Sequence, residues 1–224
     1  MSRIADAFAR IKAAANGPGL IAYVTAGDPD LARTAEILVT LAASGADVLE
    51  VGVPFSDPLA DGPVIQRASE RALASKTTLR GTLKMIKETR SRIAAPIVLF
   101  TYANPILRMG EESFVRAAVE AGVDGVLMLD LPVEEAVPFR SLLVDAGLDP
   151  IFLLSPTTTD ERIRASAALG RGFLYVISRL GVTGARAAVA TGAIDLAEYG
   201  IRRKGIDELS AIQPKSGGRI IAKA

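Results

Sequence analysis

Three features of the sequence predict an α/β fold of the (β/α)8 barrel type. Short aliphatic runs alternate with amphipathic helical patterns along residues 1–190, which is typical of a parallel sheet covered by helices. The runs begin about every 31 residues, the length of one strand–helix unit of such a barrel. A helical pattern precedes the first run, and no G-x-G-x-x-G motif follows it, which disfavours the alternative, an open doubly wound sheet.

The composition narrows the chemistry. The chain has 224 residues, a net charge of +1, and no cysteine or histidine. We therefore expect no nucleic-acid or membrane-surface binding, no thiol chemistry, no metal site built on cysteine or histidine, and no Ser-His-Asp triad. Proton transfer is left to Asp, Glu, Lys or Tyr. The N-terminal segment has no secretory signal pattern, and we expect a cytoplasmic protein.

The elements follow in order from the apolar periodicity. Ile4, Phe8 and Ile11 predict an amphipathic first helix, and Asp30 is a candidate N-cap for the next. Glycines at the ends of three helical patterns predict αβ turns: Gly45, Gly122 and Gly147. Six strands are predicted to begin near residues 20, 47, 96, 125, 150 and 173. Helices after the first are predicted over 31–45, 63–74, 78–93, 111–121, 133–146 and 160–169.

The C-terminal tail breaks this rhythm. After the sixth strand ends near residue 178, the remaining chain is too short for two further units of the same length. Residues 219–224 could form one weak strand. We expect one barrel domain over 1–224, with an atypical tail over 191–224 and strands seven and eight divergent or incomplete.

Candidate functional residues come from the ends of the predicted strands, where barrels carry their sites. Glu50 lies inside an apolar run, and alternation places it either in the barrel interior or under the helices. Burial disfavours the charged form of a carboxylate, which suits a group that exchanges a proton near neutral pH. The structural alternative is a glutamate satisfied by local hydrogen bonds, without a chemical role.

The loop after the second strand contains Ser56, Asp57 and Asp61. Long loops at a barrel mouth are often functional. The alternative is that Asp57 and Asp61 are turn and N-cap residues of the helix that begins at residue 63. No lysine follows a predicted strand, which argues against Schiff-base chemistry. Two glycines in residues 181–186 offer a weak signal for a phosphate-binding or lid loop.

Five motifs in order, over about residues 1–190, resemble the tryptophan synthase alpha subunit family. They are AYVTAGDPD, GADVLEVGVPFSDPLADGPVIQ, FTYANPIL, GVDGVLMLDLPVEE and LYVISRLGVTGAR. The resemblance implies a TIM barrel that cleaves indole-3-glycerol phosphate to indole and glyceraldehyde 3-phosphate without a cofactor. It also implies a pyridoxal-phosphate beta subunit as partner, which receives the indole in an α2β2 assembly.

The resemblance also assigns roles to residues. Glu50 matches the carboxylate that moves protons at the indole ring carbon and the glycerol hydroxyl, Asp61 matches the one that accepts the indole N–H, and Tyr175 matches a tyrosine of the same site. Residues implied in substrate binding are Tyr23, Phe100, Leu127, Leu129 and Leu153 as pocket walls and Thr183 and Gly184 as the lid loop. Loops facing the beta subunit are implied for Asp57, Asn104 and Pro105.

The tail departs from this family. In the family, the phosphate-binding loops follow strands seven and eight. Neither loop has a counterpart in this sequence beyond about residue 192. Residues 214–219 could form a substitute anion site with Lys215 and Arg219, or a flexible basic tail. An incomplete phosphate site would impair activity, which keeps open the alternative of a non-catalytic alpha-like subunit that binds and modulates the beta subunit.

Overall fold

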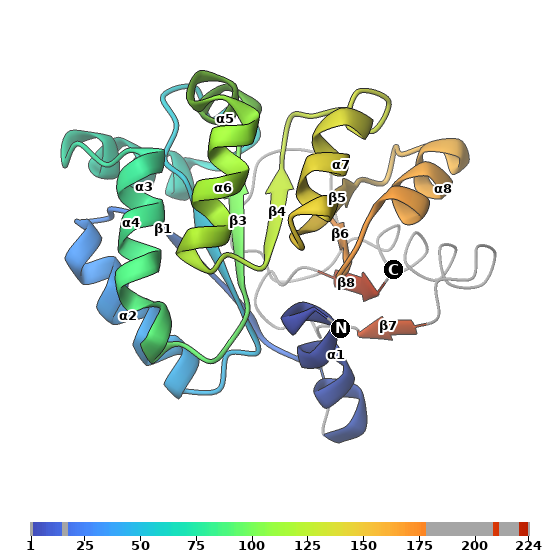
Figure 1. Cartoon of the computed structure of the whole chain (residues 1–224), viewed down its shortest axis with the longest axis horizontal. Helices are drawn as coiled ribbons and strands as arrows, with labels where there is room; N and C mark the ends of the chain where they lie inside the picture. The colour runs from blue at the N-terminus through green and yellow to red at the C-terminus, as the bar shows by residue number, and fades with distance from the viewer. Residues whose placement is uncertain (1, 15–17, 178–207, 211–219, 224) are drawn as a thin grey trace.

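A curved sheet of six parallel strands forms the body of the protein (Figure 1). The computed structural model describes residues 2–14, 18–177, 208–210 and 220–223, the last two segments at the level of the backbone. Each strand pairs in parallel with the next along the chain. The strands are β1 (Ile21–Thr25), β2 (Val48–Gly52), β3 (Ile97–Thr101), β4 (Gly125–Met128), β5 (Asp149–Leu154) and β6 (Leu174–Val176). All six predicted strands are confirmed, each starting within one residue of its expected position.

Helices flank the outer side of the sheet, except α1, which lies below it (Figure 1). They are α1 (Arg3–Ala14), α2 (Leu31–Ala43), α3 (Pro63–Ala74), α4 (Leu79–Thr89), α5 (Ala103–Met109), α6 (Glu111–Ala121), α7 (Val137–Asp145) and α8 (Asp160–Leu169). Asp30 caps α2 as predicted, because its carboxylate accepts a hydrogen bond from the Arg33 N–H at 2.7 Å. Gly45 and Gly147 follow α2 and α7 with φ of 95° and 81°, as the αβ turn requires.

Three helix predictions need correction. The pattern over 78–93 divides into α4 and a short 3-10 helix, η1 (Arg90–Arg92), and α7 begins at Val137 rather than near 133. The third correction is α5, a helix where the sequence indicated only a loop. Pro105 is tolerated there because it lies in the first helical turn, where a backbone N–H has no partner within the helix.

Side chains alternate between two separate cores. Leu49 and Val51 of β2 point outward and join a cluster between the sheet and the helices. Val48 points inward and joins a cluster in the barrel interior. The interior cluster includes Val98, Phe100, Leu127, Ile151, Phe173 and Tyr175, with Tyr23, Leu129 and Leu153 packed against it. The strands are apolar on both faces because both faces are covered.

The interior is closed at the end where the parallel strands begin. Helix α1 lies there, opposite α5 (Figure 1), and inserts Ile4, Ala7 and Phe8 into the interior cluster. The Phe8 ring lies 5.4 Å from that of Phe173. A Cβ on Gly125, the first residue of β4, would come within 2.8 Å of the Ile4 side chain. The predicted amphipathic first helix is therefore the floor of the barrel.

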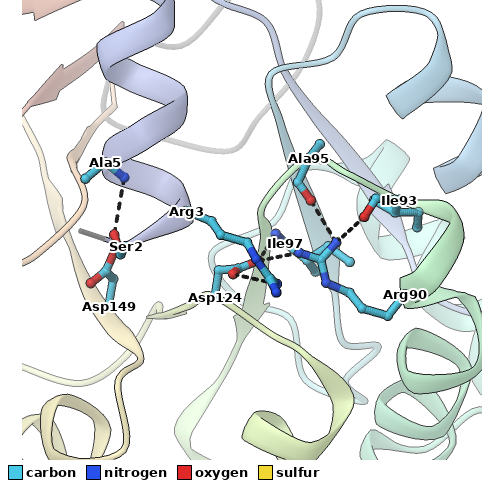
Figure 2. Close-up of polar contacts among 9 residues, drawn as sticks. All are labelled: Ser2, Arg3, Ala5, Arg90, Ile93, Ala95, Ile97, Asp124 and Asp149. Carbon is cyan, nitrogen blue, oxygen red and sulfur yellow. Dashed lines mark hydrogen bonds and ion pairs between the residues drawn. The ribbon is translucent and has the colours of Figure 1, made fainter.

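Polar contacts fasten this floor (Figure 2). The Asp124 carboxylate accepts hydrogen bonds from the Ile97 N–H at 2.8 Å, Arg90 Nη2 at 3.1 Å and Arg3 Nη1 at 3.2 Å. Arg90 Nη1 also donates to the carbonyls of Ile93 and Ala95. At the start of α1, the Ser2 hydroxyl donates to the Asp149 carboxylate and accepts from the Ala5 N–H. Two aspartates at the start of β4 and β5 thus hold α1 in place.

Two short strands extend the sheet beyond β6. The weak strand predicted over 219–224 is present as β8 (Ile220–Lys223), which runs antiparallel to β6. The strand β7 (Glu208–Ser210), which the sequence did not indicate, pairs antiparallel with β8. In the part of the chain that the structure describes, no pairing joins β7 to β1.

Candidate active site

Glu50 lies in the barrel interior, which resolves the two orientations left open by the sequence. It alternates with Leu49 and Val51, which face the helices, and so shares the inward face of β2 with Val48. Its register partners are Tyr23 on β1 and Val98 on β3. Glu50 is only 1% exposed. A carboxylate is thereby placed among apolar side chains of the interior.

Aromatic rings line the interior near this carboxylate. The ring of Tyr23 meets Phe100 edge-on at 5.4 Å, and Phe100 meets Tyr175 at 6.0 Å, which are favourable geometries for aromatic pairs. The structure brings together all five residues expected to wall a pocket, because each belongs to the interior cluster or packs against it: Tyr23, Phe100, Leu127, Leu129 and Leu153.

Gly52 makes room for the Tyr23 ring. A Cβ at position 52 would lie 2.0 Å from the Tyr23 hydroxyl oxygen and 2.5 Å from the ring carbon that bears it. Any side chain there would displace Tyr23. The sequence analysis missed this glycine, since the pairing of β1 with β2 is needed to see that Tyr23 crosses it.

Asp61 is buried at the end of the loop after β2, with an exposure of 9%. Its Oδ2 accepts a hydrogen bond from the Tyr102 hydroxyl at 3.0 Å, and its carbonyl accepts one from Gln66 Nε2 at 3.0 Å. The N-cap of α3 is Gly62, and no side chain caps this helix. The N-cap alternative for Asp61 is therefore wrong, and its carboxylate is directed toward Tyr102, the residue that follows β3.

Tyr102 ends the third predicted strand, but the sequence assigned it no role in the site. It is buried, its ring lies 5.0 Å from that of Phe55, and its hydroxyl also accepts the Ala60 N–H at 3.1 Å. Burial and, next, the negative charge of Asp61 raise the pKa of the Tyr102 phenol. Its position directly after a predicted strand was the available signal, but its partner lies 41 residues away in the sequence.

The residues expected to face a partner lie at the mouth of the barrel. Asp57 and Asn104 are exposed and Pro105 is half-buried. Asn104 and Pro105 belong to α5, which corrects their prediction as loop residues. A groove of about 380 Å³ lies here, lined among others by Phe55, Ser56, Arg80, Asn104, Pro105 and Arg108. Leu59 and Leu107 are 88% and 62% exposed in the same two segments.

Several expectations fall on other parts of the chain. Thr183 and Gly184, the expected lid residues, and the possible anion site over 214–219 lie outside the described residues. Among the residues that the structure does describe, no three acidic side chains are grouped so as to hold a metal ion. None of the described helices is long and apolar enough to cross a membrane.

Comparisons with known proteins point to one family. The family model of the tryptophan synthase alpha chain matches residues 8–198. The tryptophan synthase alpha chain of Burkholderia thailandensis is 56% identical over 186 residues, which cover 83% of this chain and 68% of the relative. The tryptophan synthase alpha chain of Paraburkholderia phytofirmans is 55% identical over 186 residues, which again cover 83% of this chain and 68% of the relative.

Solved structures of the same family are also similar to this chain. Tryptophan synthase subunit alpha from Legionella pneumophila strain Paris superposes with a TM-score of 0.76 at 43% identity, covering 79% of this chain and 68% of that one. A tryptophan synthase structure from Mycobacterium tuberculosis gives a TM-score of 0.81 at 38% identity, with coverage of 88% and 76%. The barrel fold expected from the sequence is confirmed.

Proposed function

The chain belongs to the tryptophan synthase alpha chain family, and we propose that it is a carbon–carbon lyase that cleaves indole-3-glycerol phosphate to indole and glyceraldehyde 3-phosphate. The observation that carries this proposal is the pair of buried carboxylates. Glu50 lies inside the barrel on β2, and Asp61 is bonded to the residue that follows the neighbouring strand β3. Aromatic and aliphatic side chains around Glu50 suit a flat indole ring.

Glu50 moves the protons of the reaction. As an acid it protonates the indole carbon that carries the glycerol chain, which converts the ring into an electron acceptor. As a base it takes the proton of the adjacent glycerol hydroxyl while the carbon–carbon bond breaks. The electron pair of that bond returns to the ring, which regenerates indole, and the glycerol fragment leaves as an aldehyde. The proton given to the ring carbon replaces the broken bond, so the atoms balance.

Asp61 acts on the other side of the ring. When the ring carbon is protonated, positive charge develops at the indole nitrogen. A carboxylate that accepts the indole N–H stabilises this charge, and the low dielectric of a buried site strengthens the effect. Tyr175, fully buried in the interior cluster, lines the same space.

The mouth of the barrel is the surface for a partner. Exposed leucines beside Asp57 and Asn104, next to a groove, suit a protein interface. Solved relatives include a tryptophan synthase complex from Pyrococcus furiosus. We propose that this surface binds a tryptophan synthase beta subunit in an α2β2 assembly, in the cytoplasm, which suits a chain without cysteine.

The test of the activity is direct. Purified chain is mixed with indole-3-glycerol phosphate, with and without a beta subunit, and indole is measured. Glu50→Gln should abolish indole release, since an amide cannot exchange the proton, whereas Glu70→Gln, an exposed glutamate on α3, should match the wild type. Turnover by Glu50→Gln near the wild-type rate would refute the assignment of Glu50.

Asp61 is tested in the same assay. Asp61→Asn keeps the size of the side chain and removes the charge, so kcat/KM should fall by about 10²-fold or more, as when a transition-state hydrogen-bond partner is lost. An unchanged kcat/KM would exclude Asp61 from the reaction. Because the chain has both Glu50 and Asp61 and both are buried, the structure does not favour the alternative of a non-catalytic alpha-like subunit.

A further inference from the structure

We propose that Tyr102 is a positioning residue, which orients the Asp61 carboxylate toward the indole N–H. The inference rests on the proposed function, because it concerns how that site holds its second carboxylate. Tyr102 would thereby influence how strongly the site prefers a ligand that carries an N–H donor.

The hydrogen bonds of the Tyr102 hydroxyl fix its direction. The oxygen accepts the Ala60 N–H at 3.1 Å, and the hydroxyl has only one proton to donate. That proton is given to Asp61 Oδ2 at 3.0 Å. Because both partners belong to the same loop, the hydroxyl holds the backbone next to Asp61 and the carboxylate itself.

The ring is anchored more firmly than the loop it holds. Tyr102 follows β3 directly and is 5% exposed. Its ring also packs on Phe55, which belongs to the same loop as Asp61. Asp61, by contrast, lies at the end of a segment without regular structure between β2 and α3. A hydrogen bond between buried side chains across these two segments restricts rotation of the carboxylate. A residue next to the sheet thus restricts the orientation of a carboxylate in the loop.

The hydroxyl also keeps its proton. Burial and the nearby Asp61 charge raise the pKa of the Tyr102 phenol, so it keeps its proton at neutral pH. The hydrogen bond to Asp61 is therefore not broken by ionisation of the phenol at neutral pH.

The experiment compares binding of indole with binding of 1-methylindole, which lacks the N–H donor. Calorimetry measures both dissociation constants for the full chain, so the readout does not depend on turnover. Wild type should prefer indole by about tenfold, the value of a hydrogen bond to a charged group. In Tyr102→Phe this preference should fall to about threefold or less, since the carboxylate is no longer held in place.

A matched control removes a neighbouring hydroxyl. Thr101 is buried and its hydroxyl donates to the Tyr102 carbonyl at 3.1 Å. Thr101→Val deletes a comparable hydrogen bond one residue away, without touching Asp61, and should keep the preference for indole. Equal loss of preference in Thr101→Val and Tyr102→Phe would overturn the inference, because the effect would then be one of general packing.

The remaining outcomes separate the two proposals. If wild type prefers indole and Tyr102→Phe keeps that preference, Tyr102 has no positioning role, while the proposed function stands. If wild type shows no preference, the assigned role of Asp61 fails and this inference fails with it. In Asp61→Asn, adding Tyr102→Phe should change the ratio less than twofold, since the two residues act as a unit.

A second measurement leaves Tyr102 in place. In a chain labelled with ¹³C at the phenol carbon of tyrosine, the Tyr102 signal is identified among the four by its loss in Tyr102→Phe. At neutral pH, Asp61→Asn should change the chemical shift of this signal, because the acceptor of the phenol hydrogen bond is no longer a carboxylate. If the Tyr102 signal does not move, the contact between the two residues is absent and the inference is wrong.

Discussion

At the scale of single residues, the site depends on close contacts between neighbouring strands. Glu50, Tyr23 and Gly52 show this, because Glu50 is the register partner of Tyr23, while the Tyr23 ring occupies the space above Gly52. A glycine in a strand often marks a place where another group approaches closely. Here the approaching group belongs to the proposed pocket wall.

A side chain at position 52 should therefore damage the site more than the fold. In Gly52→Val the added carbons would overlap Tyr23, which must rotate out of the pocket. We expect kcat/KM for indole release to fall by about tenfold or more, the loss caused by misplacing a group in a site. The comparison is Gly81→Ala on α4, where the added carbon meets only side chains at 3.2 Å and beyond. An active Gly52→Val variant would contradict this account of Tyr23.

How far the site could be predicted also depends on residue contacts. Glu50 stood out in the sequence as an acid in an apolar run, but its inward orientation became clear only from the two cores on either side of β2. For Asp61, the sequence offered an N-cap as the local alternative. The structure replaces this with a bond to Tyr102, a contact between distant segments that no local pattern contains.

At the scale of elements, the turns at the N-terminal end of the barrel depend on Asp124. It joins the segment before β4 to β3, η1 and α1 through the Ile97 N–H, Arg90 and Arg3 (Figure 2). Arg90 and Asp124 form a largely buried ion pair, with side chains 14% and 9% exposed. The helical pattern over 78–93 ends as α4 and then η1, where Arg90 donates to the carbonyls of Ile93 and Ala95.

Loss of this carboxylate should be costly. Asp124→Ala leaves the Arg90 charge and the Ile97 N–H without their partner, and breaking a buried pair costs about 3 kcal/mol or more of unfolding free energy. Urea unfolding followed by circular dichroism measures the change. Glu36→Ala, which breaks the exposed Arg33–Glu36 pair, should cost less than about 1 kcal/mol. Similar losses in both variants would show that burial does not set the strength of the Asp124 contacts.

The contact between α1 and β5 should respond to pH. Burial raises the pKa of Asp149, as does nearby Asp124, against the opposing effects of the Ser2 hydroxyl and the Arg171 charge. A carboxyl with a higher pKa in the folded state binds its proton first when folded, so it stabilises the fold at low pH and this contribution is lost as pH rises through the folded pKa. Relative to Asp149→Asn, wild type should therefore gain stability as pH falls from 7 to 4. The measurement is thermal unfolding of wild type and Asp149→Asn between pH 7 and pH 4. If the stabilities of the two chains change in parallel with pH, the raised pKa of Asp149 is contradicted.

At the scale of the whole molecule, the fold could be predicted because the period of the apolar runs reflects its repeating unit. All six parallel strands were found in this way, since strands covered on both faces are apolar throughout. Helix α5 was not found, because Asn104 and Pro105 together are typical of a turn, and only the structure shows that they begin a helix. The strand β7 was missed because its three residues form too short a segment for a periodic signal.

The partner surface can be tested with the whole chain. Leu107, 62% exposed on α5 at the mouth, should contact the beta subunit. Leu107→Asp buries a charge in that interface and should weaken association by about tenfold or more, as measured by analytical ultracentrifugation. Leu20→Asp alters a leucine that is 52% exposed just before β1, at the opposite end of the barrel. Equal weakening by both changes would place the partner elsewhere.

The helical floor has a consequence for traffic through the molecule. Because Ile4, Ala7 and Phe8 fill the bottom of the barrel, the interior is closed at that end and is not a channel through the molecule. In the part of the barrel that the structure describes, a molecule in the interior cannot leave past α1, so the opposite rim serves both entry and exit there. A neighbour seated over that rim would control both steps at once.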